Sequence, residues 1–168
     1  MEKTKTKMIK YTTSMITFAE IPDEICLSFN ISNCQNNCIG CHSAELRQDI
    51  GTELSSELLS ELISKNDGIT CVLFLGEGKD QKTLISLAET VKKAGLKAAL
   101  YSGRLTEEIE DCLWETFDYL KAGPYIEEFG PLNKETTNQK LFKINKKNNI
   151  FEKKDITFKF WRKNGEIY

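Results

Sequence analysis

Three cysteines with close spacing are the residues of this sequence best suited to do chemistry. Cys34, Cys38 and Cys41 form the pattern C-x3-C-x2-C within residues 33–43 (NCQNNCIGCHS), a stretch rich in asparagine that we expect to form a loop. Three thiolates this close in the sequence can bind one metal centre. A tetrahedral zinc ion needs a fourth ligand, and the adjacent His42 is poorly placed to supply it, because consecutive residues seldom reach one ion together. A redox dithiol would use Cys38 and Cys41 and would leave Cys34 without a role.

A cluster of four irons and four sulfides gives all three cysteines a role and leaves one iron open to a further ligand. That iron can bind the amino and carboxylate groups of S-adenosylmethionine, beside an electron source whose potential can reach about −700 mV. One electron then breaks a carbon–sulfur bond and releases a 5′-deoxyadenosyl radical, a reaction in which the protein supplies binding and orientation. A non-catalytic iron–sulfur or zinc-binding module is the alternative from a different class.

The composition is that of an ordinary globular domain. The 168 residues are 40% hydrophobic and 29% charged, which argues against a disordered chain. There is no run of about 18 apolar residues and no apolar block in residues 1–10, so we expect neither a membrane span nor secretion, and we predict a cytoplasmic protein. In the cytoplasm thiols stay reduced, so we expect no disulfide framework, and we expect the scattered Cys26, Cys71 and Cys112 to be small buried apolar residues.

The charge is unevenly distributed along the chain. Residues 11–139 carry −11 and residues 140–163 carry +7. A solvated edge strand guarded by lysines explains the basic segment better than a nucleic-acid interface does. We therefore predict neither nucleic acid nor a membrane as a partner.

Strands and helices alternate around the cysteine loop. Apolar patterns predict four strands, at residues 24–32, 69–75, 96–101 and 117–122. Between them, Thr52 is the predicted N-cap of a helix that ends at Ser64, Asp80 caps a second helix that ends before Gly95, and Thr106 caps a short third helix. This order predicts parallel strands joined by right-handed crossovers, with the cysteine loop at the carboxyl end of the first strand.

We therefore predict an α/β fold, a partial open (β/α) barrel with a mostly parallel sheet and a C-terminal β-hairpin. Residues 1–168 form one domain, which is too short for a complete eightfold barrel. Its α/β core spans about residues 24–122 and includes the cluster loop at 33–43. Residues 123–168 add a long loop and the hairpin, whose strands we place at 140–144 and 150–161, with Phe158, Phe160 and Trp161 packed on the last strand or facing a partner.

Four segments of the sequence resemble a known family. They are residues 34–43 (CQNNCIGCHS), 101–104 (YSGR), 118–128 (DYLKAGPYIEE) and 136–139 (TTNQ). The cysteine motif resembles that of the radical S-adenosylmethionine enzymes, and the combination resembles the activating proteins of anaerobic ribonucleoside-triphosphate reductases. The likeness runs from about Ile25 to the C-terminal hairpin.

The resemblance implies a glycyl-radical-activating enzyme with a 4Fe-4S cluster and S-adenosylmethionine as cofactors. Such an enzyme takes an electron from a donor such as flavodoxin or ferredoxin and abstracts hydrogen from a glycine of the large subunit of the anaerobic reductase. Members of this family are often dimeric, so a homodimer is expected as well. Another small radical enzyme, such as a formate-lyase-type activase or a deazapurine synthase, is the alternative within the enzyme class.

The resemblance also implies residues that hold S-adenosylmethionine. Family members usually carry Gly-Gly-Glu after the second strand of this core, whereas residues 75–78 read LGEG here, which keeps Gly76 and Glu77 for this role. Ser102 and Arg104 end the third strand of the core, and Arg104 could hold the methionyl carboxylate with two hydrogen bonds or pair with the neighbouring Glu107 or Glu108. Lys121 is a weaker candidate. His42 is predicted to be a loop residue, and residues 136–139 have no assigned chemistry.

Overall fold

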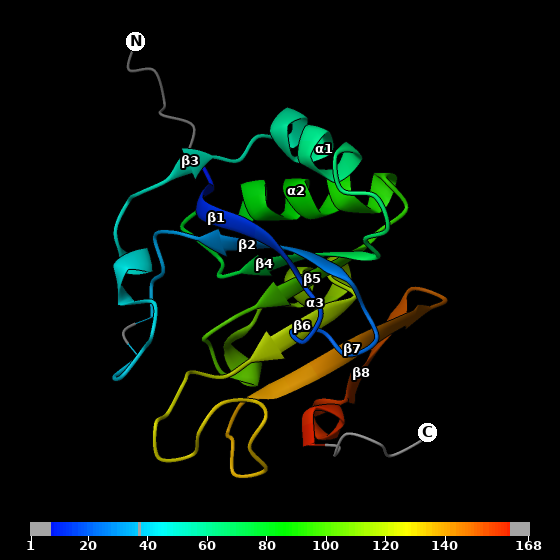
Figure 1. Ribbon diagram of the computed structural model, residues 1–168. Coiled ribbons are helices and arrows are strands. Elements are labelled where there is room, and N and C mark those ends of the chain that lie inside the picture. Colours follow the sequence, from blue (N-terminus) through cyan, green and yellow to red (C-terminus); the bar gives the residue numbers. More distant parts are fainter. Residues whose placement is uncertain (1–7, 37, 162–168) are drawn as a thin grey trace.

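The computed structural model describes residues 8–36 and 38–161, which form one mixed sheet of eight strands and three α-helices (Figure 1). The strand order across the sheet is β3-β1-β2-β4-β5-β6-β7-β8. The strands are β1 (Lys10–Thr17), β2 (Cys26–Ile31), β3 (Thr52–Glu53), β4 (Cys71–Leu75), β5 (Lys97–Tyr101), β6 (Tyr119–Ala122), β7 (Lys140–Lys147) and β8 (Ile150–Asp155). The helices are α1 (Ser56–Ser64), α2 (Gln81–Lys93) and α3 (Asp111–Thr116), with 3-10 turns at Ala44–Arg47, Thr106–Glu108 and Thr157–Trp161.

The four central strands β2, β4, β5 and β6 are parallel, as the alternation of strands and helices predicts. The strands added at both sides, β1 with β3 and β7 with β8, are antiparallel. Three of the seven pairings are therefore parallel, and the sheet as a whole is mixed where a mostly parallel one was expected. The sheet does not close on itself, and the partial barrel stays a prediction.

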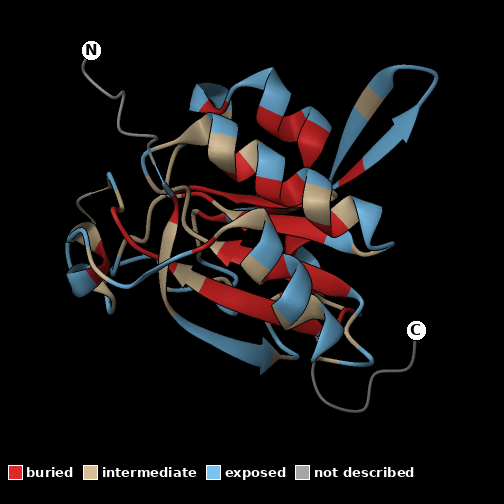
Figure 2. Cartoon of the chain, turned by 90° about the horizontal axis from the view of Figure 1, so that it is seen from above, coloured by how far each residue is buried: buried red, intermediate tan, exposed pale blue. Residues whose placement is uncertain are grey.

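The two faces of the sheet are covered differently. Buried residues of α1, α2 and α3 join one face in the larger apolar core, which includes stacked Phe29 and Phe74. The other face carries a smaller core around Cys26, Cys71 and Leu73, and no α-helix of the described residues contributes to it. Figure 2 shows the resulting contrast between the buried central strands and the exposed outer ones.

Several predicted boundaries differ from the observed ones. The first helix is capped by Ser55, whose hydroxyl accepts from the Leu58 amide, because Thr52 is instead paired with β1. After Thr106 there is only a 3-10 turn, and the third helix begins after Glu110. By contrast, Asp80 caps α2 through the Thr83 amide, as predicted.

The last element is also different. The strand predicted through Trp161 ends at Asp155, because the Asp155 carboxylate accepts hydrogen bonds from the amide and hydroxyl of Thr157 and turns the chain. Phe158 and Trp161 therefore lie in a 3-10 turn, where Phe158 is exposed and the Trp161 indole donates to the Leu132 carbonyl.

A buried carboxylate joins the amino ends of the parallel strands. Glu24, only 7% exposed, accepts hydrogen bonds from Lys97 at 2.6 Å, from Tyr119 at 2.8 Å and from Thr70 at 2.5 Å. Burial opposes ionisation of Glu24, but these hydrogen bonds outweigh it and hold its pKa below the ordinary value. The network lies at the edge opposite the ends of the strands that carry the cysteine loop.

Within the described residues, no helix combines the length and the apolar character needed to cross a lipid bilayer.

Candidate functional site

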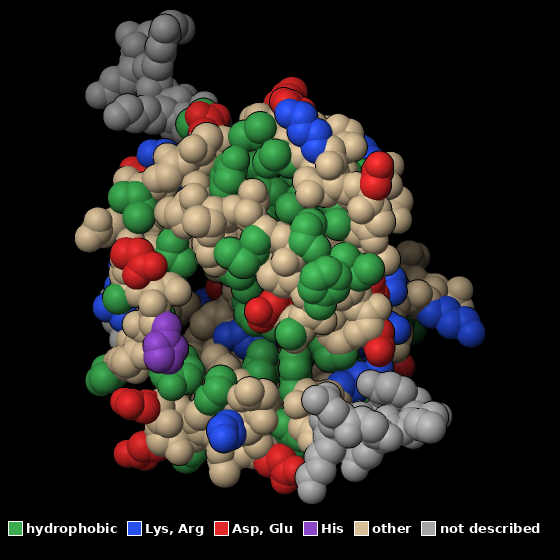
Figure 3. All heavy atoms as spheres, in the orientation of Figure 1, with side chains coloured by type: hydrophobic (Ala, Val, Ile, Leu, Met, Phe, Trp, Pro, Cys, Tyr) green, Lys and Arg blue, Asp and Glu red, His purple; other side chains and the backbone are tan. Residues whose placement is uncertain are grey.

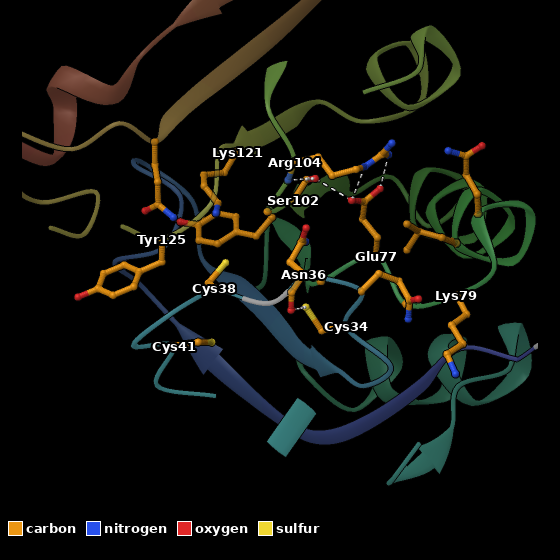
Figure 4. A pocket seen from close by; sticks show the side chains of 18 of the residues that line it. Cys34, Asn36, Cys38, Cys41, Glu77, Lys79, Ser102, Arg104, Lys121 and Tyr125 are labelled. Atoms are coloured by element: carbon orange, nitrogen blue, oxygen red, sulfur yellow. Dashed lines mark hydrogen bonds and ion pairs between the residues drawn. The ribbon is translucent and has the colours of Figure 1, made fainter. Parts of the chain in front are cut away.

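The loops at the carboxyl ends of the four parallel strands line one cavity of about 420 Å³. This volume lies within the range of about 300–1,000 Å³ that small-molecule sites occupy. The lining residues predicted from the sequence come from all four loops: Cys34, Cys38 and Cys41 after β2, Gly76 and Glu77 after β4, Ser102 and Arg104 after β5, and Lys121 at the end of β6 (Figure 4). The structure thus brings together residues that are up to 87 positions apart in the sequence, from Cys34 to Lys121. Figure 3 shows a hollow in the molecular surface beside the histidine side chain.

The cysteine loop is held by its backbone and by one arginine. The Cys34 amide donates to the Leu46 carbonyl at 2.9 Å, and Leu46 itself is buried. The Arg47 guanidinium donates to the Cys38 carbonyl at 2.7 Å. The loop therefore folds back on the 3-10 turn that follows it, and this fixes the chain at the first two cysteines.

The three thiols border one space without meeting at a single point. Each is a free cysteine of intermediate exposure. Across residues 8–36 and 38–161, no three Cys, His, Asp or Glu side chains converge closely enough to hold one ion. In a 4Fe-4S cluster each thiolate binds a different iron, so its cysteines are spread around the cluster rather than around one atom.

Lys121 supplies the cavity with a buried positive charge. Its side chain is 7% exposed, and its ammonium group donates to the Gly123 carbonyl at 3.1 Å and lies 5.4 Å from the centre of the Tyr101 ring. Burial lowers the pKa of Lys121 to about 8, although the thiols of the three loop cysteines act to raise it. A positive charge beside three thiols suits a negatively charged ligand. A cluster bound by thiolates is such a ligand.

Arg104 is engaged by two carboxylates of its own chain. Its Nε and Nη2 atoms donate to Glu77 at 3.0 and 2.6 Å. Its Nη1 and Nη2 atoms donate to Glu110 at 3.1 and 2.7 Å, and Nη1 also reaches the Glu108 carbonyl at 2.9 Å. These bonds match the five N–H donors of a guanidinium. The partners are thus Glu77 and Glu110, not the side chains of Glu107 or Glu108, and a methionyl carboxylate would have to displace one of them.

Two carboxylates share one guanidinium here, so the group formed by Glu77, Arg104 and Glu110 carries one net negative charge. Hydrogen bonds from Arg104 lower the pKa of Glu110 to about 2, and those to Glu110 and then Glu77 raise the pKa of Arg104. Ser102 donates to the same Glu77 oxygen as Arg104 does, at 2.7 Å. Glu77, on the loop after β4, is therefore held by two residues of the loop after β5, Ser102 and Arg104. The two carboxylates of this group favour a cationic group on a ligand.

Glycines bring the loops close to the cavity. Gly76 has a φ of +122°, and a Cβ there would lie 3.3 Å from the Ile31 carbonyl oxygen, so a side chain would be strained. At Gly103 a Cβ would lie 2.4 Å from Nδ2 of Asn36. The Asn36 side chain thus packs on the β5 loop and links it to the cysteine loop, a contact that the sequence analysis missed.

The segment 136–139, to which the sequence analysis assigned no chemistry, holds the loop after β6 in place. The Asn138 amide donates to the Pro124 carbonyl at 3.0 Å, and the Thr136 hydroxyl donates to the Phe129 carbonyl at 2.6 Å. Gln139 lines the cavity and lies 3.4 Å from the Gly123 carbonyl. This segment therefore holds the loop after β6 in place, and residues 124–128 of that loop line a pocket together with Cys38 and Ile39.

The other predicted residues have mixed outcomes. Cys26 and Cys71 are buried, as expected, and face each other across β2 and β4. The expectation for Cys112 is wrong, because this thiol is exposed on α3, next to the side chain of Gln81. His42 is an exposed loop residue whose ring lies 5.7 Å from that of Tyr125, in agreement with the local role expected for it.

Comparison with protein families decides between the possible metal centres. A family model described as a 4Fe-4S single cluster domain matches residues 25–151, which is most of the chain and includes all three loop cysteines and Lys121. The chain belongs to this 4Fe-4S single cluster domain family. It is thus an iron–sulfur protein, and the match favours an iron–sulfur cluster over a zinc ion as the metal centre. A search of curated proteins finds no match.

The geometry fits such a cluster. The three thiols border one cavity, the loop that carries them is held by hydrogen bonds, and a buried cation faces them from β6.

Proposed function

We propose that this protein is a radical S-adenosylmethionine activase that generates a glycyl radical on an anaerobic ribonucleoside-triphosphate reductase. The observation that carries the proposal is the set of three cysteines, one short of a complete cluster set, facing a cavity with a separate acidic side. When bound, a 4Fe-4S cluster supplies a low-potential electron and an iron that is open to S-adenosylmethionine. Cys34, Cys38 and Cys41 would be its ligands.

The acidic side of the cavity would orient the positively charged part of S-adenosylmethionine. Glu77 and Glu110 together outweigh the charge of Arg104, and a sulfonium or ammonium group nearby is stabilised by that surplus. Arg104 acts here by holding Glu77 in place together with Ser102. This role differs from the direct carboxylate contact that the resemblance implies.

A polypeptide substrate suits the open shape of the site. The sheet is not closed, and the loops after β2 and β6, which contribute Cys38 and Tyr125 to the cavity, carry exposed apolar side chains such as Ile39, at 89% exposed, and Phe129, at 44% exposed. We propose that these side chains contact the polypeptide substrate. The large subunit of the reductase would cover the site, and an electron donor such as flavodoxin or ferredoxin would supply the reducing equivalent before or during that contact.

For the expected homodimer, the outer edge of β1 is the surface that we propose. β3 pairs only with Lys10 and Tyr11, so within the described residues the rest of this edge has no strand partner. Residues 11–19 (YTTSMITFA) carry no charge, and Met15 and Phe18 are 52% and 72% exposed. A strand that meets its own copy brings like charges together, so an uncharged edge suits pairing between two copies of this chain.

Anaerobic reconstitution separates the enzyme from a non-catalytic module. We expect about four irons per chain and formation of 5′-deoxyadenosine from S-adenosylmethionine only when a reductant is present. Cys38→Ala should lose both the brown colour and the cleavage. Cys112→Ala is the matched control, because this exposed thiol lies outside the cavity and its removal should change neither. A Cys38→Ala variant with full cleavage activity would reject the proposal.

A second experiment separates the activases. The reconstituted protein is mixed with the large subunit of an anaerobic reductase or with a formate-lyase-type glycyl enzyme, and protein radicals are followed by electron paramagnetic resonance. We expect a radical on the reductase alone. A radical on the formate-lyase-type enzyme, or conversion of a free small molecule of the deazapurine type, would favour the alternatives.

A further inference from the structure

Lys121 is a buried cation without a carboxylate partner in the described part of the chain. Its ammonium group is bound to one backbone carbonyl and lies over the Tyr101 ring, but it takes part in none of the ion pairs formed by the described residues. Lys97 makes an instructive comparison. It lies at the other end of the same pair of strands, is half exposed, and is paired with Glu24 at 2.6 Å. The more deeply buried of the two lysines is thus the one that lacks a counter-charge.

A buried charge without a partner is costly, because removal from water is not repaid by another charge. Proteins therefore keep such groups where a ligand of opposite charge completes the site. The cavity that Lys121 lines holds the three cysteines, and negative charge on their sulfurs raises the pKa of Lys121 against the effect of burial. The counter-charge is thus expected on the cysteine side.

A 4Fe-4S cluster on three thiolates has a net negative charge, because the thiolates bring more negative charge than the iron–sulfide core brings positive charge. One-electron reduction adds a further negative charge. A fixed cation nearby stabilises the reduced state more than the oxidised one, and in a site of low dielectric constant this effect is large.

The position of Lys121 is fixed on several sides. It belongs to β6, where it pairs with Tyr101 on β5 and with Leu141 on β7. The Tyr101 hydroxyl is itself bound to the Glu20 carbonyl. Beyond Tyr101, Lys121 and Gln139 lies a second cavity of about 370 Å³, so these three side chains form a wall between two cavities. Lys121 therefore borders the cavity that holds the cysteines, and its neighbours limit where the ammonium group can lie.

We propose that Lys121 is the counter-charge of the cluster and raises its reduction potential, so that the reduced state becomes accessible to the electron donor. The inference rests on the cluster itself and needs no radical chemistry. It can therefore hold or fail independently of the proposed activase function.

The test is a redox titration of the reconstituted protein without S-adenosylmethionine, followed by electron paramagnetic resonance of the reduced cluster. In Lys121→Met the ratio of reduced to oxidised cluster at a fixed applied potential should fall about tenfold, which corresponds to about 59 mV for one electron. Lys121→Arg keeps the charge and should restore most of the ratio. Lys121→Gln serves as a second neutral variant, so that the test does not depend on the folding of a single variant.

Lys79→Met is the matched control. Lys79 also lines the cavity but is exposed, so water and salt screen its charge and the ratio should stay unchanged. Iron content and circular dichroism confirm that each variant is loaded and folded. If both neutral Lys121 variants titrate like the unaltered protein, the proposal is wrong. It is equally wrong if the potential shifts only after S-adenosylmethionine is added, since Lys121 would then bind that cofactor rather than balance the cluster.

Discussion

At the scale of single residues, the contacts of Arg104 change the role that the sequence suggests for it. An arginine at the end of a parallel strand is a natural partner for a ligand carboxylate, and the sequence offers Glu107 and Glu108 as competitors. Of the observed partners, Glu110 lies six positions after Arg104, whereas Glu77 lies 27 positions before it and becomes a neighbour only in the folded chain. The sequence therefore identifies Arg104 as a residue of the site but does not show which carboxylates its guanidinium binds.

We predict that Arg104→Lys lowers the rate of 5′-deoxyadenosine formation by about tenfold or more while leaving the cluster potential unchanged. Lysine keeps the charge but cannot hold two carboxylates in the planar geometry of a guanidinium. Glu110→Gln should also lower the rate, because it removes the surplus negative charge although Ser102 and Arg104 still hold Glu77. Rates are measured with saturating reductant, and the potential by redox titration. A fully active Arg104→Lys variant would show that the position of Glu77 is unimportant.

At the scale of the elements, the sequence predicts those features that depend on residues close together in the chain, such as helix caps. Asp80 caps α2 and Gly95 follows its C-cap with a φ of +78°, both as expected, because capping depends on residues within one turn. The strand β1 was missed, since it has no regular alternation and is a strand only through its pairing with β2 and β3. The 3-10 turn after Asp155 was missed for the same reason, because its aromatic residues are equally suited to a strand.

The network around Glu24 gives a prediction about pH. Because the pKa of Glu24 is lowered in the folded chain, its contribution to stability is present above the ordinary carboxyl pKa of 4.5 and is lost as the pH falls below that value. At pH 7 we expect Glu24→Gln to lower the free energy of unfolding by about 2 kcal/mol, through weaker hydrogen bonds to Lys97, Thr70 and Tyr119.

Urea unfolding at a series of pH values measures this effect. The difference between the unaltered protein and Glu24→Gln should shrink as the pH falls from about 5 toward 3. Glu61→Gln is a suitable control, because its carboxylate is paired on the exposed surface of α1 and such pairs contribute little. A difference that stays constant with pH would mean that Glu24 is not ionised in the folded protein.

At the scale of the whole molecule, the sequence predicts which loops meet but not what closes the site. The alternation of strands and helices is sufficient to bring Cys34, Gly76 and Ser102 to one edge of the sheet, because parallel strands end at the same edge. The antiparallel strands on both sides, and the wall formed by Tyr101, Lys121 and Gln139, depend on long-range pairing that no local pattern reveals.

The exposed edge of β1 gives the prediction for assembly. Met15→Lys places a charge in the middle of the edge and should convert a dimer into a monomer, because two lysines would meet across the symmetry axis. Light scattering after size-exclusion chromatography measures the mass. Lys153→Met, which changes the charge on the far edge strand β8, is the control and should leave the dimer intact. An unaltered protein that runs as a monomer at all concentrations would contradict the prediction.

The most direct test of the central claim is the electron paramagnetic resonance spectrum of the reduced cluster, recorded with and without S-adenosylmethionine. If three cysteines hold the cluster and one iron is open, the cofactor binds to that iron, and we expect a clear change in the g-values on its addition. Cys34→Ala, Cys38→Ala and Cys41→Ala should each show no cluster signal, while Cys112→Ala should behave like the unaltered protein. A cluster signal that does not respond to S-adenosylmethionine, or that survives the loss of any one of the three cysteines, would contradict the claim.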